Sequence, residues 1–141
     1  MLSALTRAVD WVWITGNHDP DMDVRCGGTL AEELEIGGTI LRHRAQRGET
    51  RPELSGHYHP RLQLTVHRRH IRRPCAVVST NEDAGGNPSG RMILPAFGTY
   101  TGGMNAADPA ILEALQPAER IDAVVPAKGR LTRFNLWSRA A

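Results

Sequence analysis

The chain has 141 residues and a formal net charge of +2, with 40% hydrophobic and 23% charged residues. These values are ordinary for a soluble globular protein of one domain, and the charge alone indicates no class of partner. No apolar run approaches a membrane span, and the first 15 residues lack the layout of a signal peptide. Because Cys26 and Cys75 are too few for a disulfide framework, we expect a cytoplasmic protein with no membrane partner.

The amino-terminal part predicts one short helix followed by strands. Residues 3–9 are typical of the last turns of a helix, and residues 10–14 indicate a buried strand of an α/β layer. Residues 29–35 are compatible with helix or strand. Because Gly37-Gly38 is typical of a turn and the apolar residues 39–41 follow it, we favour a hairpin.

The rest of the chain predicts mainly strands. Residues 45–52 are polar and predict a loop, and from residue 62 to 66 apolar and polar residues alternate, which indicates a strand with one solvated face. Four further short strands are expected, at residues 75–79, 92–96, 121–125 and 131–136. Residues 81–90 predict a long turn-forming tip with little propensity for order. A helix is expected to start at Asp108, as N-cap, and Pro109.

Polar side chains that can bind a metal follow three of these predicted strands. Asn17 and His18 come after the first strand, His43 ends the apolar run 39–41, and His57 and His59 stand two residues apart next to a glycine and a proline. Loops at the carboxyl ends of strands are where side chains converge over a rigid scaffold. Imidazole and amide oxygen are good ligands for Zn, Mn or Fe, although a lone histidine is more often an ordinary surface or core residue.

Taken in chain order, these motifs resemble the last three of the five sequence blocks of the calcineurin-like metallophosphoesterases. The motifs are Gly16-Asn17-His18-Asp19, Leu41-Arg42-His43 and Gly56-His57-Tyr58-His59. Residues 94–105 (LPAFGTYTGGMN) further resemble one branch, the bacterial ligase-associated DNA-damage-response endonucleases. The resemblance spans residues 10–136, and the order of the blocks is more specific than any single block.

The resemblance implies an α/β (α+β) fold, a four-layer β-sandwich flanked by helices, with two divalent metal ions (Mn, Zn or Fe) at the strand ends. Asn17, His43 and His57 would bind the second metal, and His59 the first. His18 would act as general acid or as a hydrogen-bond donor next to the phosphate. The implied reaction is hydrolysis of a phosphodiester, with DNA as a possible substrate, in functional association with DNA ligase and helicase.

The chain departs from this family upstream of Gly16. An Asp-x-His block and a Gly-Asp block, which supplies the bridging carboxylate, are expected there, but the first 15 residues contain one acid, Asp10, in no matching context. We therefore expect residues 1–141 to form a single, amino-terminally truncated domain that lacks the opening strands of the sandwich and is inactive alone. Whether Met1 is the true start stays open, and the alternative is a non-catalytic remnant that binds one metal or a partner protein.

The densest basic stretch lies at residues 61–73. It contains the arginines and histidines Arg61, His67, Arg68, Arg69, His70, Arg72 and Arg73. Arginine side chains suit the phosphates of a nucleic acid, but a solvated charged face is the simpler interpretation, and we favour it at this point. Residues 97–103 are rich in small residues, so this loop either lines the site or is only a tight turn.

Overall fold

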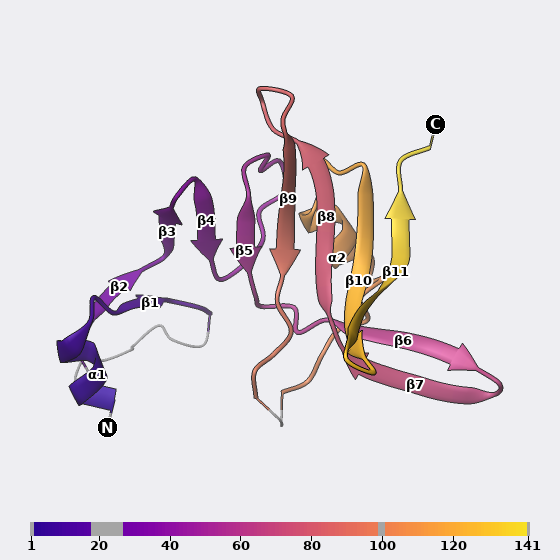
Figure 1. Ribbon diagram of the computed structural model, residues 1–141, viewed down its shortest axis with the longest axis horizontal. Coiled ribbons are helices and arrows are strands. Elements are labelled where there is room, and N and C mark those ends of the chain that lie inside the picture. Colours follow the sequence, from indigo (N-terminus) through magenta and orange to yellow (C-terminus); the bar gives the residue numbers. More distant parts are fainter. Residues whose placement is uncertain (1, 18–26, 99–100, 141) are drawn as a thin grey trace.

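The computed structural model describes residues 2–17, 27–98 and 101–140 (Figure 1). Its centre is a seven-stranded mixed sheet. From one edge to the other the strands are β11 (Arg130–Ser138), β10 (Arg120–Ala127), β8 (Ala76–Glu82), β9 (Pro88–Ile93), β5 (Glu53–Ser55), β4 (Thr39–Arg42) and β3 (Glu33–Ile36). The pairs β4–β5 and β5–β9 are parallel and the others antiparallel. The α/β fold class predicted from the sequence is confirmed.

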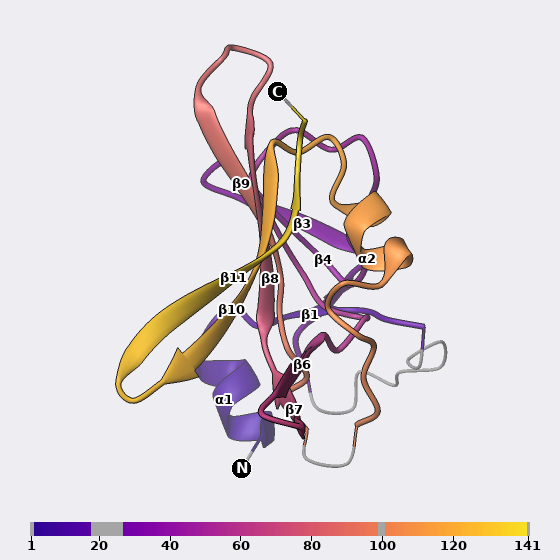
Figure 2. The same ribbon diagram turned by 90° about the vertical axis from the view of Figure 1, so that its right-hand side faces the viewer.

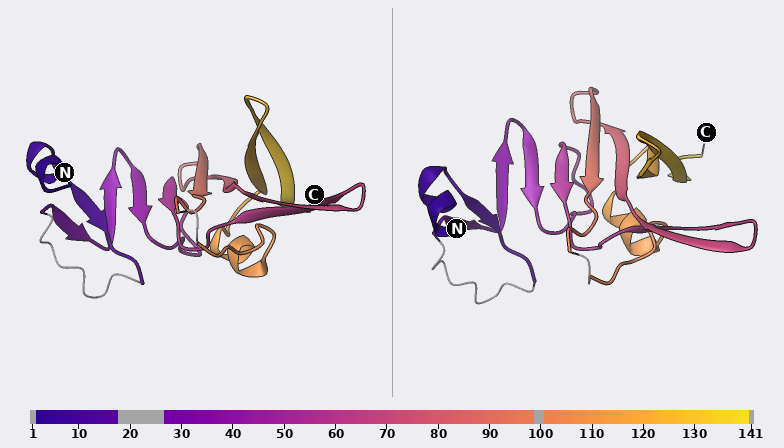
Figure 3. Two further views of the ribbon diagram at one scale, coloured as in Figure 1. Left: turned by 90° about the horizontal axis from the view of Figure 1, so that it is seen from below. Right: turned by 60° about the horizontal axis from the view of Figure 1, so that its bottom comes forward.

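The amino-terminal elements lie beyond the β3 edge of this sheet (Figures 1 and 3). Helix α1 (Leu2–Ala8) confirms the predicted helix, and β1 (Val12–Ile14) pairs in parallel only with β2 (Thr29–Ala31). The strand expected at residues 10–14 is present as β1, but the expectation that it is buried is wrong, because Val12 is 36% exposed and Trp13 and Ile14 are only partly buried. No described helix is long and apolar enough to cross a membrane.

The hairpin preferred for residues 29–41 is confirmed as β3–β4. Gly37 and Gly38 have φ angles of 58° and 77°, the left-handed conformation that a two-residue hairpin turn requires. Residues 45–52 form the predicted loop.

The long tip predicted at residues 81–90 is wrong in extent. Strands β8 and β9 stay paired as far as Glu82 and Pro88, and β9 ends at Ile93 rather than continuing through residue 96. The Asp83 carboxylate accepts hydrogen bonds from the backbone N–H groups of Gly85 and Asn87, both at 2.8 Å. These hydrogen bonds to Asp83 close the turn within five residues, 83–87, so the pairing of β8 with β9 extends farther than predicted.

One helix and the long carboxyl-terminal hairpin complete the core. Helix α2 (Pro109–Ala114) packs on one face of the sheet (Figure 2), and the Asp108 side chain caps it by accepting from Ala110 N–H at 2.9 Å. Ile111 of this helix is fully buried in one cluster with Ile93 and Ile121 of the sheet. The helix start and the two last strands are confirmed, and both strands are longer than predicted.

A two-stranded antiparallel ribbon, β6 (Arg61–Val66) and β7 (Arg69–Pro74), projects from the sheet at the end opposite to α1 (Figures 1 and 3). The alternation predicted for β6 holds at its base, where Leu62 is buried. Farther out it fails, since Val66 is exposed and every residue of β7 is exposed. The ribbon leaves the body of the protein, so its outer apolar residues have no core to enter.

Candidate metal centre

Three loops meet at the lower edge of the sheet in the view of Figure 1. Asn17 follows β1, His43 follows β4 directly, and His57 stands two residues after β5. Because β4 and β5 are parallel, their carboxyl ends lie at the same edge, and the Gly56 N–H donates to the His43 carbonyl at 2.9 Å. The topology therefore brings together side chains that are 14 to 40 residues apart in sequence.

The three side chains converge on one point through single atoms. His43 Nε2 lies 2.9 Å from Asn17 Oδ1 and 3.0 Å from His57 Nδ1, and His57 Nδ1 lies 3.2 Å from Asn17 Oδ1. Each ring nitrogen can carry one proton, and the amide oxygen can only accept. Protons can therefore satisfy at most two of the three contacts, whereas a cation would attract the lone pairs of all three atoms.

This triangle fits a divalent metal ion. Two ligands at about 2.1 Å from one ion and at right angles to each other are separated by about 3.0 Å, close to the three distances found here. Two imidazoles and an amide oxygen also form a donor set that suits Zn, Mn or Fe. Of the four metal ligands expected from the sequence, the structure thus brings Asn17, His43 and His57 together.

The close approach of the His43 ring to Gly16 explains why a glycine precedes Asn17. A Cβ atom at position 16 would lie 2.7 Å from both Cε1 and Nδ1 of the His43 ring. Any other residue would displace the ring or the loop, because real Cβ atoms do not approach so closely. Gly16 therefore lets the β1 loop close over His43, with Asn17 in reach of its ring.

The loop after β5 is held in an unusual conformation. His57 and His59 have φ angles of 68° and 48°, which cost non-glycine residues on the order of 1 kcal/mol each. Buried Tyr58 anchors the loop between them: its hydroxyl accepts from Arg44 Nε at 3.2 Å, and its ring stacks edge-on against His57. Arg44 and Tyr58 were not predicted, although each adjoins a predicted ligand in the sequence.

The other two predicted site residues are placed differently. His59 is half-buried, and no hydrogen bond within the described residues joins its ring to the Asn17–His43–His57 cluster. Its carbonyl lies against Gly103, where a Cβ atom would come within 2.6 Å of it. His18 falls in residues 18–26, outside the described part of the chain.

No carboxylate joins the cluster in the part of the chain that the structure describes. There, no group of three or more His, Cys, Asp or Glu side chains could hold a metal. The donors found among the described residues are thus two imidazoles and an amide oxygen, none of which brings a negative charge to a bound ion.

A buried network of charges supports the strands that carry the histidines. Glu53 of β5 is 1% exposed and pairs with Arg91 Nη2 of β9 at 3.0 Å and with Arg42 Nε of β4 at 3.3 Å. Arg91 Nη2 also donates to the carbonyls of Gln46 and Ala114, at 2.7 and 3.0 Å. Since His43 directly follows Arg42, this network fixes the end of β4 from which the ring projects.

Glu49 extends this network to the surface of the 45–52 loop. Its carboxylate accepts from Arg42 Nη2 at 2.9 Å and from Arg51 Nη2 at 2.8 Å. The hydrogen bonds from Arg51, and after them that from Arg42, lower the pKa of Glu49 to about 2 although burial opposes the shift. Sequence analysis missed the network because acids and arginines in short strands ordinarily indicate a solvated face.

Comparison with known proteins finds similarity to a solved structure but to no family or curated sequence. No protein-family model and no curated protein sequence matches the chain. Among solved structures, the crystal structure of Pseudomonas putida nuclease MPE is similar, with a TM-score of 0.58 and 26% sequence identity over 94% of this chain. The chain spans 57% of the length of that nuclease. The likeness shows that this chain shares its fold with the corresponding part of that nuclease.

Proposed function

We propose that the Asn17–His43–His57 cluster is one metal position of a metal-dependent phosphodiesterase of the calcineurin-like type that acts on nucleic acid. The observation that carries this proposal is the convergence of three lone-pair atoms within 3.2 Å of one another at the carboxyl ends of the strands. The similarity to a nuclease supports the choice of a phosphodiester as substrate. An association with DNA ligase and helicase rests on the sequence resemblance alone.

Each residue has a distinct task in this proposal. Asn17, His43 and His57 would hold a divalent ion, which as a Lewis acid polarises a phosphoryl oxygen and lowers the pKa of bound water. Because these ligands are neutral, the site keeps a positive potential that attracts an anionic phosphodiester. Gly16 and Tyr58 orient the two rings. We assign His59 to a second metal, whose remaining ligands would have to be carboxylates, and His18 to proton donation to the leaving oxygen.

One observation favours a second candidate, a protein that binds a single metal without hydrolysing a substrate. No carboxylate joins the cluster within the described residues. A two-metal mechanism needs anionic ligands to hold two cations a few ångströms apart. The two candidates share the metal position and differ in whether turnover follows.

Hydrolysis of bis-p-nitrophenyl phosphate distinguishes these candidates. Residues 1–141 alone should release almost no nitrophenol. When an upstream segment with the Asp-x-His and Gly-Asp blocks is added, we expect Mn²⁺-dependent release that EDTA and the double substitution His43→Ala/His57→Ala abolish. A rate independent of Mn²⁺ or of both histidines would overturn the phosphodiesterase proposal. No release above background from the extended chain, if it still binds Mn²⁺, would select the second candidate.

The role assigned to His18 has its own test. In a chain to which the upstream blocks have been added, His18→Ala should reduce turnover while the metal content stays the same, whereas His57→Ala should lower both. Loss of metal from the His18→Ala variant, with the metal retained in His57→Ala, would reverse the two assignments.

A further inference from the structure

The β6–β7 ribbon carries positive charge without any counter-charge. No Asp or Glu occurs between Glu53 and Glu82 in the sequence. In the described structure, none of the ribbon arginines pairs with a carboxylate, whereas arginines of the sheet such as Arg42 and Arg91 do. Arg69 and Arg73 are exposed. Such unpaired guanidinium groups are free to bind anions.

The strand register divides the ribbon into two faces. The pairs Gln63–Arg72 and Thr65–His70 lie on a polar face, with Arg61 at its base. Here Arg61 Nη2 donates to the Thr101 carbonyl at 3.1 Å and Arg72 Nη2 to the Gly103 carbonyl at 2.6 Å. These two arginines therefore fasten the ribbon to the 101–103 loop, and their charge serves this attachment.

The opposite face of the ribbon is apolar and borders a cleft. Leu62 pairs with Arg73, Leu64 with Ile71 and Val66 with Arg69. Between this face and the β10–β11 hairpin lies a cavity of about 370 Å³. Among its lining residues are Leu62, Leu64, Ile71, Arg73, Lys128 and Phe134.

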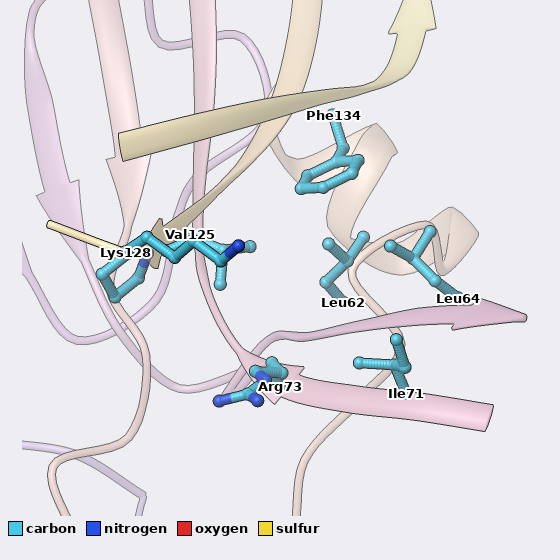
Figure 4. A pocket seen from close by; sticks show the side chains of 9 residues that line it. Leu62, Leu64, Ile71, Arg73, Val125, Lys128 and Phe134 are labelled. Carbon is cyan, nitrogen blue, oxygen red and sulfur yellow. The ribbon is translucent and has the colours of Figure 1, made fainter. Parts of the chain in front are cut away.

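Figure 4 shows how these side chains are arranged. The Phe134 ring lies on one side of the cleft, Leu62, Leu64 and Ile71 lie on the other, and Arg73 and Lys128 stand at one end. No carboxylate lines the cleft. An occupant must therefore combine a flat or compact apolar part with negative charge at its edge.

A nucleotide of a nucleic-acid strand has this combination. Bases stack on aromatic side chains irrespective of sequence, while arginine and lysine bind the flanking phosphates. An apolar peptide would leave the two cations without partners. The ribbon also begins at Arg61, two residues after His59, so a strand held along it would lead toward the candidate metal centre.

We propose that this cleft is a nucleic-acid binding site, in which one unstacked base lies against Phe134 and the neighbouring phosphates contact Arg69, Arg73 and Lys128. The proposal deepens the proposed function and rests on it for the choice of a nucleic acid. In this arrangement the cleft binds the nucleic-acid strand at a distance from the phosphate that is hydrolysed.

Binding of a fluorescein-labelled oligothymidylate of about 16 nucleotides, followed by fluorescence anisotropy over a series of NaCl concentrations, tests the phosphate contacts. The triple variant Arg69→Gln/Arg73→Gln/Lys128→Gln should bind at least tenfold more weakly, with a salt slope lower by about 2, as expected for three lost contacts. A matched variant, Arg7→Gln/Arg47→Gln/Arg139→Gln, removes three exposed arginines elsewhere and should retain both affinity and slope. Equal behaviour of the two triple variants would overturn the proposal.

The base contact requires a separate variant. Phe134→Leu keeps the site apolar but removes the ring, and it should weaken binding of the oligothymidylate about tenfold while binding of a blunt duplex stays the same. An equal effect on both, or none on either, would exclude a base from the cleft. All binding is measured in EDTA, so these results do not depend on the metal centre. Conversely, bis-p-nitrophenyl phosphate is too small to reach the cleft, so its hydrolysis does not depend on the cleft. Failure of the phosphodiesterase proposal and failure of the cleft proposal can therefore be told apart.

Discussion

Arginine has opposite surroundings in the sheet and in the ribbon. In the sheet, Arg42 and Arg91 are buried and share the carboxylate of Glu53. In the ribbon, Arg69 and Arg73 are exposed and face no described carboxylate. The same residue type therefore supports strands in one region and is available to a ligand in the other. Substitutions should separate these roles, since the first affects unfolding and the second affects binding.

The largest effect should follow loss of the shared carboxylate in the sheet. Glu53→Gln leaves the buried Arg91 guanidinium without an anion and removes one of the carboxylates that pair with Arg42, so we expect the free energy of unfolding to fall by about 3–5 kcal/mol. Urea denaturation followed by circular dichroism measures this loss. Glu82→Gln, an exposed acid of the same sheet, is the control and should change stability by less than about 0.5 kcal/mol. A similar loss of stability in Glu53→Gln and Glu82→Gln would contradict the stabilising role of the buried carboxylate.

The next effect concerns the glycine that lies against His43. Gly16→Ala places a methyl group 2.7 Å from the ring, so it should weaken Mn²⁺ binding about 10- to 100-fold, as does loss of other groups that orient metal ligands. Gly102→Ala is the matched control, since a Cβ there meets nothing within 4 Å. Isothermal titration calorimetry compares the two. Unchanged affinity in Gly16→Ala would mean that the β1 loop does not position the ring.

A smaller effect should appear in acid. The pKa of Glu49 is lowered from 4.5 to about 2 in the folded chain, so its contribution is fully present above pH 4.5 and is lost as the pH falls toward 2. We expect a loss of about 1–2 kcal/mol over this window, reduced from the full shift because the partner Arg51 is half exposed. In Glu49→Gln this part of the pH dependence should vanish. An identical dependence of stability on pH in the unaltered chain and in Glu49→Gln would contradict the assignment of this loss to Glu49.

The smallest effect is expected in the ribbon. Arg69→Gln breaks no described ion pair, so it should alter the free energy of unfolding by less than about 0.5 kcal/mol. Thermal unfolding of this variant beside Glu53→Gln measures the contrast directly. A loss above about 1 kcal/mol would show that the ribbon arginines stabilise the fold.

The candidate metal centre was largely predictable from the sequence, and its supports were not. The meeting of His43 and His57 could be predicted because they follow neighbouring parallel strands, whose carboxyl ends lie at one edge. Asn17 follows β1 of a separate two-stranded sheet, so its place beside them was expected only from the family resemblance. The burial of Arg91 could not, because a strand of alternating residues gives no sign that an arginine faces the core. It lies inward only because Glu53 and two backbone carbonyls meet it there, and these contacts depend on the tertiary arrangement.

The ribbon shows a different limit of sequence patterns. Alternation correctly predicted the strand at residues 61–66, but the pattern is local and cannot tell whether the apolar face meets a core. Leu62, at the base of the ribbon, is buried in the core, whereas Val66 is exposed to solvent. The basic stretch likewise became interpretable only when the register placed Arg73 at the cleft and Arg72 at the 101–103 loop.

The most direct test of the central claim is a titration of the chain with Mn²⁺, followed by electron paramagnetic resonance and calorimetry. We expect one ion to bind, and His43→Ala/His57→Ala to abolish this binding. The control His67→Ala/His70→Ala removes two exposed histidines of the ribbon and should bind Mn²⁺ as the unaltered chain does. Equal Mn²⁺ binding by both double variants would contradict the claim that Asn17, His43 and His57 form a metal centre.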